Sequence, residues 1–345
     1  MESQNRKNVK KNYIYNVIYQ LFVLLTPLIT TPYVSRVLGS AGIGQYSFTN
    51  SLITYFILLS SLGFGYYAQR EIAKEQGDKT AQSKTFWEIF IARLGSVSIS
   101  LLIYVLLLLN GAFGDYQQLM WILIVNIIAS AFDITFLFQG NEQFGIIVLR
   151  NVIVKIIGIA AIFIFVQDQA DVWVYVLCNS LILIGSNLSL WTRLPAVLSK
   201  VKCSELNVKR HIIPTLRLFI PTIAVSVYTI LDKTLIGVLI PGTVTGVGED
   251  GLEIIIKISD IENGYYEQSD KLVKMVMTVV TSLGTVMIPR NSQEIASGNI
   301  DRFKENIYSA LQFVFFLGVP MTFGMMAVAQ NVTPWFFGEG YEKVP

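Results

Sequence analysis

Nine apolar stretches, each long enough to cross a lipid bilayer, recur along this chain of 345 residues. A hydrocarbon core about 30 Å thick takes about 20 helical residues. The predicted spans are residues 13–35, 45–68, 86–110, 117–139, 150–167, 172–192, 218–240, 272–289 and 307–329. Because lipid cannot hydrogen-bond an exposed backbone, the pattern predicts an all-α, polytopic membrane protein. The hydrophobic share of 53% agrees with that class.

Basic residues are sorted unevenly between the segments that connect these spans. Of the 26 Lys and Arg residues, 18 lie in one alternating set of segments, which includes the N-terminus and residues 193–217. Five lie in the other set. By the positive-inside bias, the first set faces the cytoplasm. We therefore expect a multi-pass protein of the bacterial inner membrane with a cytoplasmic N-terminus.

The basic segment 193–217 divides the chain into two predicted lobes. A complete six-helix lobe covers residues 1–192, and a partial lobe of three helices covers 218–345. The predicted architecture is a two-lobed transporter fold whose second lobe is truncated. The segment itself has two interpretations, an orientation signal or a binding site for anionic lipid headgroups.

The start of the second lobe repeats features of the first. Pro27…Arg36-Val-Leu-Gly39…Gly44-Gln-Tyr46 corresponds to Pro221…Lys233-Thr-Leu-Ile-Gly237…Gly264-Tyr-Tyr266. An even number of spans separates the two copies, which indicates a parallel repeat about an axis along the membrane normal. Chance similarity between apolar helices is the alternative.

Several classes of chemistry are excluded by what the sequence lacks. His211 is the only histidine, which argues against a His-based metal site and a serine–histidine hydrolase. No G-x-x-x-x-G-K-[ST] motif occurs, so the chain cannot hydrolyse a nucleotide by the P-loop route. We expect no enzymatic activity, no cofactor, no metal and no nucleic-acid partner.

Three charges fall inside successive predicted spans at a similar depth. Arg93 lies ~12 Å from the cytoplasmic end of its span, and Asp133 and Lys155 lie ~9 Å from theirs. Charges in lipid are costly and mark functional sites by default. Either Asp133 neutralises one cation while the other reaches the interface, or the cations form a vestibule for an anionic headgroup.

A second polar group lies near the other face. Asp232 and Lys233 are ~22 Å from the cytoplasmic face, and Arg36 lies at a similar height, although an interfacial basic residue is often a headgroup anchor. Asn50 and Tyr46 offer an amide and an aromatic face to a sugar. Such polar groups also serve as hydrogen bonds between helices.

Motifs along the whole chain resemble the Wzx-type polysaccharide repeat-unit flippases of the multidrug/oligosaccharidyl-lipid/polysaccharide exporter superfamily. The most specific string is Phe138-Gln-Gly140-Asn-Glu142-Gln-Phe144 followed by Arg150-Asn-Val-Ile-Val-Lys155. The others are Pro32-Tyr-Val-Ser-Arg36-Val-Leu-Gly39, Leu231-Asp-Lys233-Thr-Leu-Ile-Gly237, Asn263-Gly-Tyr-Tyr266 and Val286-Met-Ile-Pro-Arg290. One departure is segment 241–262, which is longer than the usual loop and could lie on the membrane or re-enter it.

The resemblance implies two six-helix lobes, or twelve to fourteen helices in all, around a cationic cavity. The implied substrate is an undecaprenyl-diphosphate-linked oligosaccharide, moved to the outer leaflet by alternating access for capsular, exo-polysaccharide or O-antigen assembly. Membrane lipids, a polysaccharide polymerase and other assembly proteins are the implied partners. On this hypothesis the substrate-binding residues are Arg36, Tyr46, Asn50, Arg93, Asp133, Lys155, Asp232 and Lys233.

Three alternatives remain open at this stage. A multidrug or cation antiporter of the same superfamily favours an acidic cavity, whereas deep cations here match or outnumber deep acids. A polymerase or ligase of lipid-linked sugars needs a large external loop with catalytic Arg or His. A scaffold without transport is the third.

The uneven distribution of basic residues predicts the orientation of the chain in the membrane. A membrane-impermeant thiol reagent added outside intact cells should label a cysteine engineered within 243–250 and should spare Cys203. The opposite pattern would reverse the topology and the direction of transport.

Overall fold

The computed structural model describes residues 2–247, 253–296 and 298–345. The long helices are α1 (Glu2–Ser61), α3 (Lys79–Leu109), α4 (Gln117–Ala131), α6 (Phe144–Phe165), α7 (Val172–Trp191), α9 (Ile212–Leu239), α10 (Ile258–Ala296) and α11 (Ile300–Phe337). Shorter helices are α2 (Phe64–Lys74), α5 (Thr135–Gly140), α8 (Leu194–Val197) and the 3-10 turns η1 (Gly114–Tyr116), η2 (Gln169–Asp171), η3 (Cys203–Glu205) and η4 (Val208–His211). Strands β1 (Thr243–Val247) and β2 (Glu253–Lys257) complete the chain.

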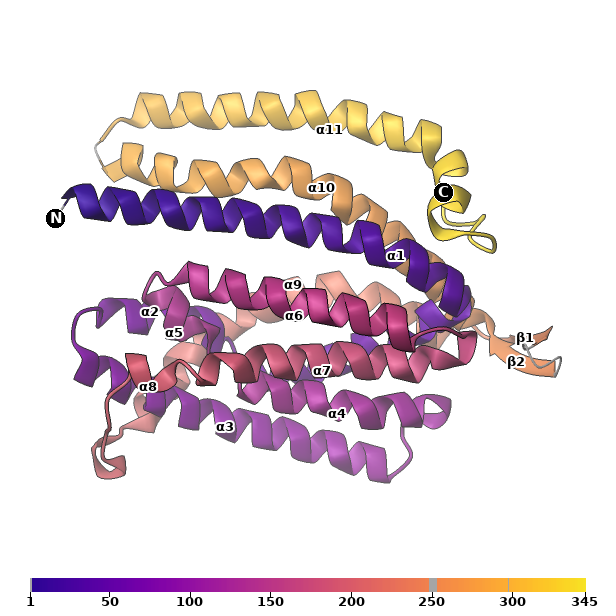
Figure 1. Cartoon of the computed structure of the whole chain (residues 1–345), viewed down its shortest axis with the longest axis horizontal. Coiled ribbons are helices and arrows are strands. Elements are labelled where there is room, and N and C mark those ends of the chain that lie inside the picture. Colours follow the sequence, from indigo (N-terminus) through magenta and orange to yellow (C-terminus); the bar gives the residue numbers. More distant parts are fainter. Residues whose placement is uncertain (1, 248–252, 297) are drawn as a thin grey trace.

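The long helices run roughly parallel to one another, so the connections gather at two ends of the bundle (Figure 1). The N-terminus lies at one end with α2, α5 and α8, and we call this the N-terminal end. The two strands and the C-terminal segment lie at the other, which we call the hairpin end. The basic segments around α2 and α8 thus share an end with the N-terminus, as the two-sided sorting of charge requires.

Seven helical runs of the described residues are long and apolar enough to cross a bilayer. They are Leu25–Lys74, Lys79–Leu109, Gly114–Gly140, Phe144–Phe165, Gln169–Val197, Val208–Leu239 and Ile300–Phe337. These runs confirm an all-α polytopic membrane protein, whereas the count of nine is not confirmed. The first two predicted spans fall in one continuous helical run. Most side chains of the predicted span 272–289 lie outside those described, although its backbone belongs to α10.

The first two predicted spans are joined through Gly39 within α1. Gly39 has φ 66° and ψ 177°, a conformation that residues with a side chain rarely adopt. This residue therefore divides α1 into a first arm, residues 2–38, and a second arm, residues 40–61. The sequence placed a connecting segment of several residues here, but a single glycine is enough to make the turn.

Residues 241–262 contain an antiparallel hairpin, which sequence analysis did not anticipate. Thr243 pairs with Lys257 and Val247 with Glu253, and α10 follows β2 directly at Ile258. The run of β-branched residues at 254–256 explains the strand, because such side chains favour extended backbone. In the proposed repeat the hairpin lies between Gly237 and Gly264, the counterparts of Gly39 and Gly44, so the second copy carries an insertion at this point.

Buried apolar side chains form separate cores in the two parts of the chain. One cluster of buried side chains lies between α1, α3, α4, α6 and α7 at the hairpin end. A second cluster lies at the N-terminal end, between α2, α3, α5 and the start of α8. A third, smaller cluster joins Phe337 and Tyr341 of the C-terminal segment to Tyr265 and Leu272 of α10. The division into lobes stays a prediction, because the second cluster also includes Leu194 and Leu198 of the 193–217 segment and is contacted by Leu218.

The second arm of α1 crosses α10 with the two backbones in contact. A Cβ atom on Gly44 would overlap the carbonyl oxygen of Asp260, and one on Gly264 would overlap that of Ser40. Gly44 and Gly264 are the matching glycines of the proposed repeat. Ser47 and Glu267, which are also 220 positions apart, are hydrogen-bonded at 2.8 Å. Contacts between equivalent positions are what a two-fold axis between two copies produces.

Gly264→Ala tests this crossing. We expect a loss of stability of about 1–3 kcal/mol, because a methyl group has no room against the Ser40 carbonyl. Gly318→Ala on α11 is the matched control, since its Cβ would meet nothing within 4 Å and alanine favours helix. Thermal unfolding in detergent provides the comparison. Equal melting temperatures for the two variants would contradict the close crossing.

Candidate functional site

Lys233 lies in an ion-pair cluster that joins α9 to α10. Its Nζ is 2.5 Å from Glu267 Oε2 and 3.1 Å from Asp270 Oδ2. Lys271 Nζ lies 3.4 Å from Glu267, and Lys274 Nζ lies 2.7 Å from Asp270. We call these five residues the lysine cluster. Each of the two carboxylates that pair with Lys233 is shared with a second lysine, so the cluster as a whole carries one net positive charge.

The lysine cluster is attached to the second arm of α1 through Ser47, whose Oγ donates to Glu267 Oε2 at 2.8 Å. Next to the cluster, the Asn263 amide of α10 donates to the Lys233 carbonyl of α9 at 2.8 Å. The Lys233 side chain is only 13% exposed. Sequence analysis missed the pairing because the predicted span began at residue 272, whereas α10 begins at Ile258 and brings both carboxylates onto the helix.

The other predicted residues at this end have separate surroundings. Arg36 donates from Nη2 to the Trp335 carbonyl at 2.7 Å, at the end of α11. The Tyr46 ring packs on Tyr175, with centroids 4.8 Å apart. Asp232 accepts a hydrogen bond from Tyr266 Oη at 2.6 Å. Asn50 is half-buried on the second arm of α1. Their role in substrate binding stays a prediction.

Arg93 and Asp133 meet where the predicted fourth span breaks. The helix stops after Ala131 and resumes as α5 at Thr135, and Arg93 Nη1 donates to the Asp133 carbonyl at 2.5 Å. Arg93 Nη2 is 3.9 Å from the Asp133 carboxylate, which accepts hydrogen bonds from the Thr135 backbone and hydroxyl. Arg93 is 6% exposed. Of the two cations that the sequence offered as partners of Asp133, the structure pairs it with Arg93 and not with Lys155.

Lys155 has no ion pair or hydrogen bond with any residue of the described ranges. It is half-buried on α6, whose 22 residues are about as long as the hydrocarbon core is thick. The structure begins this helix at Phe144, six residues before the predicted span. Lys155 therefore lies near the middle of α6, about 16 Å from its start, which is deeper than predicted. A lysine at that depth has further to reach to place its ammonium in water.

A buried carboxylate fastens the 193–217 segment to the first lobe. The side chain of Glu88 is fully buried and accepts from the Asn207 backbone at 2.7 Å, from Arg210 Nε at 2.7 Å and from His211 Nε2 at 2.8 Å. His211 Nδ1 is in turn 2.7 Å from Tyr67 Oη. We call this group the Glu88 clasp. The only histidine of the chain is thus engaged in holding the segment.

Comparisons with known proteins match this chain to proteins of polysaccharide biosynthesis and transport. A family model described as “Polysaccharide biosynthesis protein” matches residues 9–294 of the chain. A solved structure named “protein A” matches 96% of this chain and 74% of its own, with a TM-score of 0.58 and 14% identity. At that identity the likeness shows a shared fold alone.

Two curated relatives carry the name “Putative O-antigen transporter”. The one from Escherichia coli (strain K12) is 26% identical over 232 residues, which are 65% of this chain and 55% of the relative. The one from Shigella dysenteriae is 22% identical over 340 residues, which are 96% of this chain and 79% of the relative. The chain thus spans about half the length of the first relative and a larger share of the second.

A double-mutant cycle tests the Arg93–Asp133 pair. Asp133→Asn removes the charge but keeps an oxygen for Thr135. It should cost about 1–3 kcal/mol, because Arg93 is buried but the Asp133 side chain is 37% exposed and lies 3.9 Å away. Adding Arg93→Gln should recover part of that loss. Thermal unfolding of the single and double variants in detergent gives the coupling, and additive effects would mean that the residues do not interact. The exposed Lys74–Glu71 pair is the control, and its coupling should stay below about 1 kcal/mol.

Proposed function

Because the chain belongs to the polysaccharide biosynthesis protein family, we propose that it moves undecaprenyl-diphosphate-linked oligosaccharides across the membrane. The lipid tail stays in the bilayer while the diphosphate and sugars pass between the two lobes by alternating access. The direction is from the cytoplasmic to the outer leaflet, and the product feeds capsular, exo-polysaccharide or O-antigen assembly. The names of the two relatives as transporters support this function.

The position of Lys155, near the middle of α6 and without a counter-charge among the described residues, supports the proposed mechanism most. A cation near the bilayer midplane is costly unless a ligand or partner compensates it. Among the described residues it has no such partner, and it does not belong to the Arg93–Asp133 pair. Transporter sites lie near the midplane, at the interface between repeats. We propose that the Lys155 ammonium replaces part of the water that the diphosphate loses on entering the membrane.

The lysine cluster supplies a second cation in this mechanism. Lys233 is neutralised by Glu267 and Asp270 while α10 packs against α1. Ser47 belongs to the first lobe and helps to hold Glu267 in place. Separation of the lobes removes that hydrogen bond and frees the cluster to rearrange around an anionic headgroup. The charge of Lys233 is thus made available when the path opens.

The energy for transport need not come from a nucleotide. With the cytoplasm negative, moving one negative charge outward gains about 2.3 kcal/mol per 100 mV of membrane potential. A diphosphate carrying two charges gains about twice that. The chain has no P-loop, and its only histidine is buried in the Glu88 clasp. These features favour transport over catalysis by a polymerase or ligase.

Substitution of Lys155 separates charge from hydrogen bonding. In a strain that lacks the chromosomal gene, Lys155→Arg should restore polymer export, whereas Lys155→Gln should reduce it more than tenfold at equal membrane abundance. The reason is that a charged hydrogen bond to phosphate is worth about 1.5–3 kcal/mol. Lys202→Gln is the control, because Lys202 is exposed in the 193–217 segment.

The readout is surface polymer together with accumulation of lipid-linked repeat units inside the cell. Wild-type export by Lys155→Gln would remove Lys155 from the mechanism. For Lys233, the informative variant is Lys233→Gln combined with Glu267→Gln. The double change keeps the net charge of +1 that three lysines and two carboxylates give the cluster, whereas the single change lowers it to zero. Wild-type export by that double variant would show that the cluster has a structural role only.

A further inference from the structure

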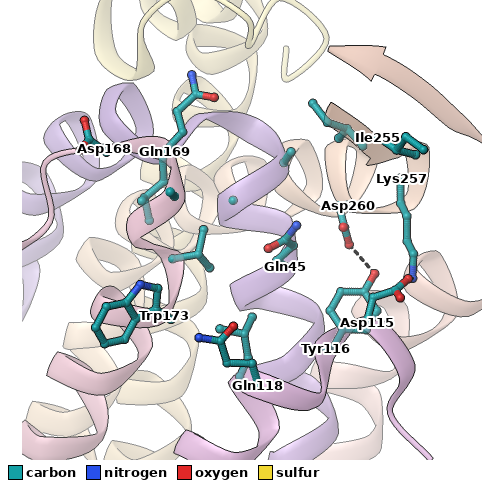
Figure 2. A pocket seen from close by; sticks show the side chains of 17 residues that line it. Gln45, Asp115, Tyr116, Gln118, Asp168, Gln169, Trp173, Ile255, Lys257 and Asp260 are labelled. Atoms are coloured by element: carbon teal, nitrogen blue, oxygen red, sulfur yellow. Dashed lines mark hydrogen bonds and ion pairs between the residues drawn. The ribbon is translucent and has the colours of Figure 1, made fainter. Parts of the chain in front are cut away.

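A cavity of about 670 Å³ opens at the hairpin end, apart from the cations discussed above. Its walls come from four stretches that are distant in the sequence: α1 around Gly42, η1 with the start of α4, the η2–α7 turn, and strand β2 with the start of α10. Figure 2 shows Gln45 and Gln118 facing this space, with Trp173 on one side and the Tyr116–Asp260 pair on the other. The volume lies within the range of about 300–1,000 Å³ that is usual for small-molecule sites.

Three side chains of the lining offer unused hydrogen-bonding capacity. Gln118, Gln169 and Trp173 form no side-chain hydrogen bond with any described residue, although each lines the cavity. Each amide provides both donors and an acceptor, and the indole provides a donor beside a flat apolar face. Trp173 is 43% exposed. A sugar ring requires this combination, because its hydroxyl groups donate and accept while its C–H face packs on an aromatic ring.

The opposite wall is held in a fixed arrangement. Tyr116 Oη donates to Asp260 Oδ1 at 2.6 Å, and both residues are nearly inaccessible to solvent. The Lys257 ammonium lies 4.4 Å from the centroid of the Tyr116 ring and 2.8 Å from the Asp115 carboxylate. The hairpin is thereby fastened to the α3–α4 connection. A preformed wall reduces the entropy that a ligand loses on binding.

The charges of the lining indicate which ligands fit. Asp115, Asp168 and Asp260 contribute carboxylates, against the single ammonium of Lys257. This excess of acid disfavours phosphate and other anions. It is compatible with neutral sugars and with amino sugars. The cavity thus differs in charge from the proposed path of the diphosphate.

We propose that this cavity, the hairpin pocket, binds a saccharide at the face where the transported sugars emerge. The proposal rests on the proposed function for its biological meaning. Its chemistry stands on the unpaired amides, the exposed indole and the acidic lining. Two sources carry the same sugars, namely the lipid-linked repeat unit after crossing and the finished polymer outside the cell.

Binding can be measured on the purified protein in detergent by saturation-transfer difference NMR. The first probe is the mixture of oligosaccharides released by mild acid from the lipid-linked pool of the producing cells, and the second is the finished polymer. We expect saturation transfer to the sugar protons of the oligosaccharide. Trp173→Ala should abolish it, and Gln118→Ala should weaken binding about tenfold. Transfer to the polymer as well would identify it as a second source.

Trp121→Ala is the matched control. Trp121 lies near the start of α4, is 44% exposed and does not line the pocket. Its loss should therefore affect anchoring at the membrane interface as much as the loss of Trp173, but not saccharide binding. Binding that survives Trp173→Ala, or that Trp121→Ala weakens equally, would overturn the proposal. Displacement of the oligosaccharide by inorganic diphosphate at equal concentration would do the same, because it would indicate an anion site.

The two proposals fail in different ways. If wild-type protein restores export in the deletion strain but binds neither saccharide, the hairpin pocket is wrong and transport stands. If it binds saccharide through Trp173 but does not restore export, the pocket stands and the proposed transport is wrong.

Discussion

Hydrocarbon does not solvate charge, and most of the polar architecture of this chain follows from that constraint. Arg93 is held against Asp133 at a break between helices, Lys233 lies between two carboxylates, and Glu88 collects the backbone and side-chain donors of the 193–217 segment. Each arrangement places a counter-charge beside a charge that would otherwise be stranded. Lys155 differs from these charges, because it lies near the middle of α6 and has no ion pair or hydrogen bond with any described residue.

The contact between α1 and α10 depends on glycines that the proposed repeat places in equivalent positions. Gly44 and Gly264 let the backbones of α1 and α10 touch, and this approach brings Ser47 within reach of Glu267. A packing contact and an ion-pair cluster are therefore linked, since opening the crossing also disturbs the surroundings of Lys233. In the proposed mechanism, this linkage lets separation of the lobes change the charge presented to the substrate.

Sequence reasoning predicted the membrane class and offered Asp133 as the counter-charge of one nearby cation, without saying which. Both follow from apolar length and depth, which are properties of the chain itself. Sequence reasoning missed features that depend on where a helix begins. The early start of α10 turned Glu267 and Asp270 from loop residues into partners of Lys233, and the early start of α6 moved Lys155 towards the midplane. The sequence did not predict the hairpin pocket, because its walls come from segments far apart in the chain. It did not predict the Glu88 clasp either, because that group joins α3 to a segment more than a hundred residues away.

The central claim is that this chain moves a lipid-linked saccharide between leaflets. Reconstitution into liposomes that contain undecaprenyl-diphosphate-linked oligosaccharide tests it most directly, with a membrane-impermeant lectin reporting the share of sugar that is accessible from outside. The account predicts that wild-type protein raises this share above the outer-leaflet fraction seen in protein-free vesicles, and that Lys155→Gln does not. Equal accessibility with wild-type protein and with no protein would contradict it.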